Sequence, residues 1–413
     1  MTQRGVVVNS ALIVTAQSTQ AIAVGAIALF LPLIRSDLHI SFGQAGLLSA
    51  VTTLTYALMQ IPSGVLADRF NPKLLFAIGI LGTNTLAILF AVTQSFGWLL
   101  AIQAVAGVFR ALTFVPGMLL ITRHFSEKRR ATAMGLFVAG GFSSNILLNL
   151  VGPFLVEPLG WRGLIILSSS LGLVVLALFW LLGDNAPAPA PHETLNVGAS
   201  VWRDPAWWLL GVIQFARLAI VSGFTFWLPA YLVIERGFSL TQAGLLVALS
   251  SAITAPANIG GGIISDRLGR PIAVIGVSLG ALAVLLGFVG HLSNVVWLII
   301  VVAAIALFIQ LYFGPIFAVP RQLFGARVAG LSSGFGNFCA NLGGFASALA
   351  LGILKDATGS FALGFLILAG VAVISLAATI ALARIARRHP SARSQGPGSV
   401  DGPSLQGQRL TST

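Results

Sequence analysis

The segment Gly64-Val-Leu-Ala-Asp68-Arg69-Phe-Asn71-Pro72-Lys73 has a counterpart 198 residues further along this chain, Gly262-Ile-Ile-Ser-Asp266-Arg267-Leu-Gly269-Arg270-Pro271. The same offset relates Ser41-Phe-Gly-Gln-Ala-Gly-Leu-Leu48 to Ser239-Leu-Thr-Gln-Ala-Gly-Leu-Leu246. Each charged segment lies between two long apolar stretches. A repeat of this length predicts two homologous halves with the same order of elements.

The composition is that of a membrane protein. Of the 413 residues, 57% are hydrophobic and only 8% are charged, against about 25% charged in a soluble domain. The 46 glycines suit helices that pack closely in lipid. Because a helix needs about 20 apolar residues to cross the hydrocarbon layer, the apolar runs predict twelve spans, at residues 10–34, 44–66, 74–93, 99–122, 131–156, 164–183, 206–231, 241–264, 272–291, 295–318, 329–354 and 361–385.

The basic residues predict the orientation of these spans. Lys and Arg are retained on the cytoplasmic side during insertion, and with the N-terminus inside, 17 of the 23 fall in cytoplasmic segments. We therefore expect a multi-pass protein of the cell's inner (cytoplasmic) membrane with both termini in the cytoplasm. The net charge of +12 then reflects topology, and it does not indicate a nucleic-acid partner.

The predicted spans divide the chain into two bundles and two polar segments. We expect an N-terminal six-helix bundle at 1–183 and a C-terminal six-helix bundle at 205–385. Between them, 184–204 contains Ala186-Pro-Ala-Pro-Ala-Pro191, which is typical of a cytoplasmic linker, since proline cannot continue a helix. Residues 386–413 contain few large apolar side chains and are expected to form a disordered cytoplasmic tail. We expect the protein to act as a monomer.

The two charged segments resemble the signature of the major facilitator superfamily, which lies between helices 2 and 3 and between helices 8 and 9. The first copy departs from the family pattern at Asn71 and Pro72, and the second at Pro271. The resemblance implies an all-α membrane fold of twelve transmembrane helices in two pseudo-symmetric bundles. It also implies a cytoplasmic gate, formed by Asp68, Arg69, Lys73, Asp266, Arg267, Arg270, Arg123 and Arg321. An alternative is that these basic residues only enforce topology.

A second resemblance concerns the last third of the chain. The segments Gly336-Asn337-Phe-Cys-Ala-Asn341-Leu-Gly343-Gly344-Phe345 and Gly352-Ile-Leu-Lys-Asp356-Ala-Thr-Gly359-Ser360 are similar to the organic-anion symporter and organophosphate exchanger branches of that superfamily. This resemblance implies a secondary active transporter of small anions.

The charges at membrane depth point to the same chemistry. An ionised side chain at the bilayer centre costs about 2.5 to 3.5 kcal/mol or more and usually has a function. Only Arg110 and Arg217 lie at that depth, while all eleven acidic residues fall in loops, at helix ends or in the tail. Arginine donates paired hydrogen bonds to carboxylate or phosphate. We therefore expect a small anionic substrate to be the missing counter-ion. The structural alternative is that Arg110 bonds helix carbonyls or snorkels, and that Arg217 lies nearer the cytoplasmic surface.

Neutral polar side chains near the two arginines are candidates for binding the rest of the substrate. Aligning the helices at 10–34 and 206–231 pairs Gln17 with Gln214 and Gln20 with Arg217. Hydrogen bonding between helices is an equally good use for any one of them. The further candidates for the site are Tyr56, Gln310, Tyr312, Asn337 and Asn341. The sequence contains no metal-ligand spacing, phosphate-binding loop or nucleophile–base cluster, so we expect neither an enzyme nor a metal or cofactor.

The cavity is expected to lack a carboxylate or histidine that could carry a proton. Three mechanisms then remain: anion exchange, symport with the proton on the substrate or on Asp37 or Glu157, and facilitated diffusion, in that order of preference. A multidrug or neutral-solute exporter is the alternative function, although Gln103 stands where drug exporters usually carry an arginine. A receptor or scaffold would need a sizeable soluble domain or an extended partner-binding surface, and the sequence shows neither.

Overall fold

The computed structural model describes residues 3–123, 125, 130–183, 201–324 and 329–388, and this part of the chain is helical throughout apart from short connections. The first half contains α1 (Gln3–Leu29), α2 (Leu31–Leu38), α3 (Phe42–Arg69), α4 (Pro72–Val92), α5 (Phe96–Arg123) and α6 (Arg130–Leu182). After the short helix η2 (Val201–Arg203), the second half contains α7 (Pro205–Ile234), α8 (Leu240–Leu268), α9 (Pro271–Val289), α10 (Val295–Leu311), α11 (Phe313–Phe324), α12 (Ala329–Thr358) and α13 (Ala362–Arg388).

The twelve predicted spans all lie on these helices. Eleven segments of the described chain are long and apolar enough to cross a membrane. One of them, in α6, has 50 residues, or about 75 Å of helix, which is more than twice the thickness of the hydrocarbon layer. Gly160 divides it, with φ of 66° and ψ of 167°, a conformation that only glycine adopts readily. The two parts of α6 are therefore the fifth and sixth spans of a twelve-helix fold.

Two predicted spans are broken where the sequence suggested one continuous helix. The first is divided at Phe30 between α1 and α2, and the tenth at Tyr312 between α10 and α11. Prolines follow both breaks, at Pro32 and Pro315. A proline inside a helix lacks the N–H and clashes with the carbonyl four residues earlier. Proline favours a break at these positions, although other helices of this chain, such as α3 with Pro62 and α8 with Pro256, continue past an internal proline.

The repeat seen in the sequence is also a repeat of structure. α3 and α8 both begin with a capping box, in which Ser41 accepts from the Gln44 amide and Ser239 accepts from the Gln242 amide. In each case the glutamine side chain bonds back to the serine amide, so two free N–H groups are satisfied. Asn71, which departs from the family pattern, caps α4 by accepting from the backbone of residue 73.

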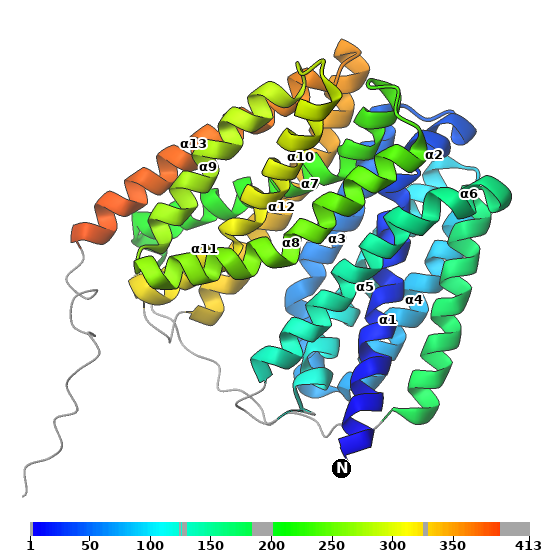
Figure 1. The fold of residues 1–413 in the computed structure, drawn as a ribbon. Helices are drawn as coiled ribbons and strands as arrows, with labels where there is room; N and C mark the ends of the chain where they lie inside the picture. The colour runs from blue at the N-terminus through cyan, green and yellow to red at the C-terminus, as the bar shows by residue number, and fades with distance from the viewer. Residues whose placement is uncertain (1–2, 124, 126–129, 184–200, 325–328, 389–413) are drawn as a thin grey trace, which may run out of the picture.

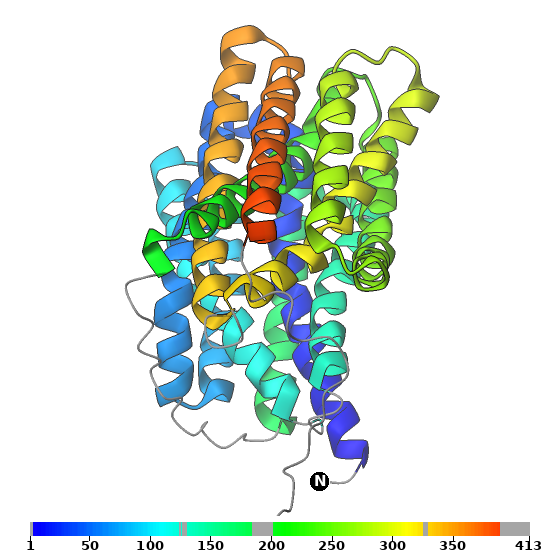
Figure 2. The same cartoon turned by 90° about the vertical axis from the view of Figure 1, so that its left-hand side faces the viewer.

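The two halves lie together at one end of the molecule, which carries the α1–α2 and α12–α13 connections, and diverge toward the N-terminus (Figures 1 and 2). We call these the closed end and the open end. At the closed end α12 packs on α3, and α6 packs on α8. Gly46 and Gly244 lie at these two crossings, where an added Cβ would overlap the carbonyl oxygens of Ala348 and Asn149. The repeated glycines permit the halves to approach at the level of their backbones.

One carboxylate links the halves at the closed end. Asp356, near the end of α12, accepts from the backbone amides of Phe42 at 2.9 Å and Gly43 at 2.6 Å. These amides are the first two of α3, and helix N-termini favour negative charge. The carboxylate thus satisfies amides that would otherwise need water.

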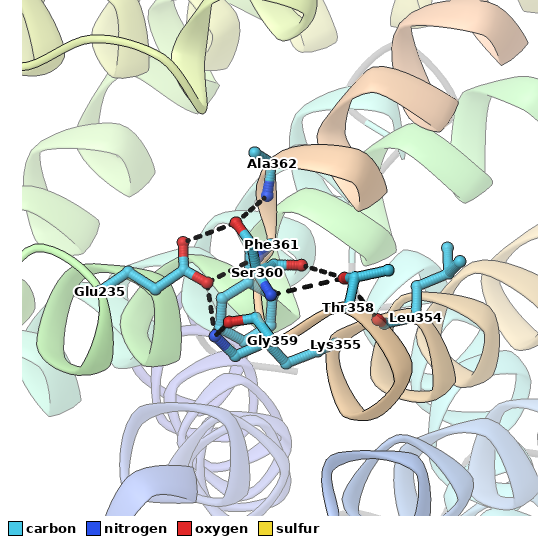
Figure 3. Close-up of polar contacts among 8 residues, drawn as sticks. All are labelled: Glu235, Leu354, Lys355, Thr358, Gly359, Ser360, Phe361 and Ala362. Atoms are coloured by element: carbon cyan, nitrogen blue, oxygen red, sulfur yellow. Dashed lines mark hydrogen bonds and ion pairs between the residues drawn. The ribbon is translucent and has the colours of Figure 1, made fainter.

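Two ion pairs at this end each lie within one half. Glu235, after α7, accepts from the Lys355 ammonium at 2.5 Å and from the Phe361 amide at 2.6 Å, and Lys355 also donates to the Gly359 carbonyl (Figure 3). In the first half, Asp37 pairs with Arg162 at 3.0 Å. The first network ties α7, α12 and α13 together.

Candidate functional site

A cavity of about 560 Å³ lies between the two halves. Its walls come from α1, α3, α4, α5 and α6 on one side and α7, α8 and α10 on the other. Of the predicted binding residues, five line it: Gln17, Gln20, Tyr56, Arg110 and Gln310. They belong to α1, α3, α5 and α10, so side chains from both halves meet at one site.

Arg110 is the cation of this cavity. Its guanidinium carbon lies 4.9 Å from the centre of the Tyr56 ring, within the range of a cation–π interaction. Among the described residues, no acidic side chain pairs with Arg110. A guanidinium has five N–H donors, so most of its capacity is available to a ligand in the cavity.

The amides beside Arg110 form a chain on the wall of the first half. Gln17 donates to Gln20 at 3.3 Å, and Thr113 donates to the same Gln20 oxygen at 3.2 Å. The side-chain oxygen of Gln17 is buried without a partner among the described atoms. The two glutamines thus bond to each other within α1, and the bond from Thr113 of α5 to Gln20 is of the kind between helices that the structural alternative expected.

The repeat continues into the cavity wall. Ser49, Thr52, Thr53 and Tyr56 follow the spacing of one helix face on α3, and residues 247, 250, 251 and 254 are their counterparts on α8 at the same offset of 198. The latter three are Ser250, Ser251 and Thr254. Their hydroxyls donate to the carbonyls four residues earlier. The hydroxyl protons are thus used within α8, and the oxygens of this wall can accept hydrogen bonds from a ligand.

Sequence reasoning missed these α8 hydroxyls and the cavity residues Asn145 and Asn149 of α6. The hydroxyls had a signal, because adding 198 to the position of Tyr56 gives Thr254. The asparagines had none, since an amide in an apolar helix is equally typical of helix packing.

Five predicted binding residues lie outside the cavity wall. Arg217 and Gln214 are buried in α7, where the arginine Nε donates to the glutamine at 2.7 Å. Tyr312 is buried at the break between α10 and α11. Asn341 donates to the Asn337 carbonyl within α12, at 2.8 Å. In this conformation these side chains are separate from the site around Arg110.

The predicted gate residues occupy the open end. Arg69, Asp266, Arg267 and Arg270 are exposed. Lys73 is buried, and its ammonium donates to the carbonyls of Trp180 at 3.1 Å and Gly183 at 2.5 Å. It therefore caps the end of α6 within its own half, where a cation is favoured. The side chains of Asp68, Arg123 and Arg321 lie outside the described residues.

Two bundles of six spans around a central cavity define a membrane transporter, and the chain matches the model of the Major Facilitator Superfamily over residues 13–348. The chain belongs to this family, as the resemblance predicted, and it is a transport protein of the membrane and not an enzyme.

The chain is also similar to individual transport proteins. The chain is 24% identical to the nitrite extrusion protein of Bacillus subtilis over 350 residues, which cover 83% of the chain and 86% of that protein. It is also 24% identical to the hexuronate transporter of Bacillus subtilis over 380 residues, which cover 87% and 90%. A solved structure of a bacterial homolog of the human lysosomal transporter Spinster, inward-facing and unoccupied, matches with a TM-score of 0.82 at 17% identity, covering 94% of this chain and 99% of that one.

Proposed function

We propose that this transporter moves a small organic anion across the cytoplasmic membrane, with the acidic group of the substrate bound to Arg110. One observation supports this proposal: Arg110 lies in the cavity between the two halves, and none of the described residues that line this cavity is acidic. Burying an unpaired charge is costly. A carboxylate bound to the guanidinium removes that cost.

The rest of the cavity favours a substrate that also carries hydroxyl groups. Ser250, Ser251 and Thr254 present acceptors on α8, and Gln310 presents an amide on α10. Hydroxyl groups of a sugar acid would donate to these oxygens. Two relatives are named for anions, nitrite and hexuronate, and the second of these is a six-carbon sugar acid.

Transport follows from rocking of the two bundles, at 1–183 and 205–385, around the cavity. The open end is the cytoplasmic end in this proposal, because the charged loops predicted to stay in the cytoplasm are there. An empty cavity keeps the charge of Arg110 uncompensated and resists closure, whereas a bound anion removes this resistance. Exchange of one anion for another is the mechanism that this coupling favours.

The alternative of a multidrug exporter has less support. A lipophilic cation would meet the charge of Arg110 at close range without an acidic side chain among the described residues to offset it. A neutral solute would leave the same charge without a partner.

Reconstituted vesicles test the proposal. Protein in vesicles loaded with gluconate is expected to take up labelled gluconate faster than protein in empty vesicles, as exchange requires. Arg110→Gln should abolish uptake, and Arg110→Lys, which keeps the charge without the planar fork, should retain part of it. Normal uptake of organic anions by Arg110→Gln would show that the proposal is wrong.

A further inference from the structure

The second arginine at membrane depth has a site of its own. Arg217 is 6% exposed, and Gln214, which accepts from its Nε, is 4% exposed. The guanidinium carbon lies 5.2 Å from the centre of the Phe313 ring and 5.8 Å from that of Phe317. No acidic residue among those described contacts it. Two aromatic rings and one amide thus surround a cation that has no counter-ion.

A buried hydroxyl beside this cation also has no partner. The side chain of Tyr312 is fully buried, and its hydroxyl makes no hydrogen bond with any described atom. Tyr312 directly precedes Phe313, whose ring centre lies 5.2 Å from the guanidinium carbon of Arg217. Leaving a buried hydroxyl unpaired is unfavourable, because its hydrogen bonds to water are lost and not replaced. An anion between the guanidinium and the phenol would satisfy both groups at once.

This site borders the cavity of Arg110. Val221, one turn after Arg217 on the same face of α7, lines the cavity. Gln310 of α10, three residues before Phe313 of α11, lines it too. The separation comes from α11, which carries Phe313 and Phe317 and begins directly after the break at Tyr312. A rotation of α11 about this break would remove both rings from the guanidinium.

We infer that Arg217, Gln214 and Tyr312 form a second anion subsite, which is closed in this conformation and accepts a carboxylate when α11 moves away. Arg217 and Gln214 would bind the carboxylate oxygens, and Tyr312 would donate its hydroxyl. The subsite takes the second acidic group of a dicarboxylate whose first acid is on Arg110. This inference rests on the proposed function, and it adds selectivity for dianions over monoanions of the same skeleton.

Gluconate and glucarate are the matched probes, because they differ only in a second carboxylate at the far end of the same six-carbon chain. Binding to the purified full chain is measured by calorimetry. Arg217→Gln is expected to weaken glucarate binding at least about tenfold, because hydrogen bonds from a charged group to the second carboxylate are lost. The affinity for gluconate should stay within about twofold. Equal weakening of both acids, or of neither, would overturn the inference.

Tyr312→Phe provides a second variant that keeps the fold. It removes only a hydroxyl that is unpaired in this conformation, so thermal stability should be unchanged or raised, while glucarate binding weakens and gluconate binding does not. Unchanged glucarate affinity in Tyr312→Phe would contradict the subsite. Arg110→Gln separates this test from that of the proposed function. Gluconate binding that survives Arg110→Gln contradicts the proposed function, whereas gluconate binding that Arg110→Gln abolishes, with glucarate binding unaffected by Arg217→Gln, contradicts the subsite only.

Discussion

Replacing Asp356 by alanine is expected to open the closed end. The carboxylate accepts from the amides of Phe42 and Gly43 across the two halves, at 2.9 and 2.6 Å. A hydrogen bond to a charged group contributes about 1.5–3 kcal/mol, and the position at a helix N-terminus about 0.3–1 kcal/mol. Because Asp356 is exposed, water replaces part of this energy. We expect a net loss of about 2 kcal/mol, which changes the ratio of the two conformations about 30-fold.

Spin labels across the closed end measure this ratio. Cysteines at Ser36 and Ala357, both exposed, carry the labels in a background in which Cys339 is replaced by serine. Asp356→Ala should add a population with a longer label-to-label distance. Asp37→Asn is the matched control, because its carboxylate bonds to Arg162 within one half and should leave the distances unchanged. A distance distribution in Asp356→Ala that equals that of the parent would refute the reasoning.

Three further predictions concern other contacts. Glu235→Ala leaves the buried Lys355 without its carboxylate and should destabilise the protein by about 3–5 kcal/mol; an unchanged melting temperature would contradict this. Gly46→Val should prevent close packing at the closed end and slow transport, whereas Gly64→Val, at a position with open space around it, should not; equal rates in transport assays would argue against the role of the first glycine. Lys73→Met removes two bonds to the end of α6 and should lower the melting temperature while the transport rate per folded protein stays normal; lost transport would favour the gating role.

Apolar run length and the repeat were sufficient to predict the twelve spans and the two halves. The breaks at Phe30 and Tyr312 were not recognised, although Pro32 and Pro315 follow them. A count of apolar residues gives the length of a span, but it does not include the effect of proline on the backbone within that span.

The binding site could be predicted only in part. Arg110 was selected because a charge in an apolar helix is unusual, and its side chain lines the cavity. Arg217 was selected by the same argument, but the rings of Phe313 and Phe317 on α11 lie against it and separate it from the cavity. Which side chains cover a residue depends on the packing of distant helices, and no pattern within α7 contains that information.

Two adjacent residues near the end of α12 make contacts with different halves of the protein. Lys355 bonds to Glu235 within the second half, whereas Asp356 bonds to α3 of the first half. Consecutive helix positions are rotated by roughly 100° about the axis, so inserting one residue before Lys355 would turn both side chains away from their partners. The protein should therefore tolerate changes of length in its polar linker much better than a single insertion or deletion in this turn.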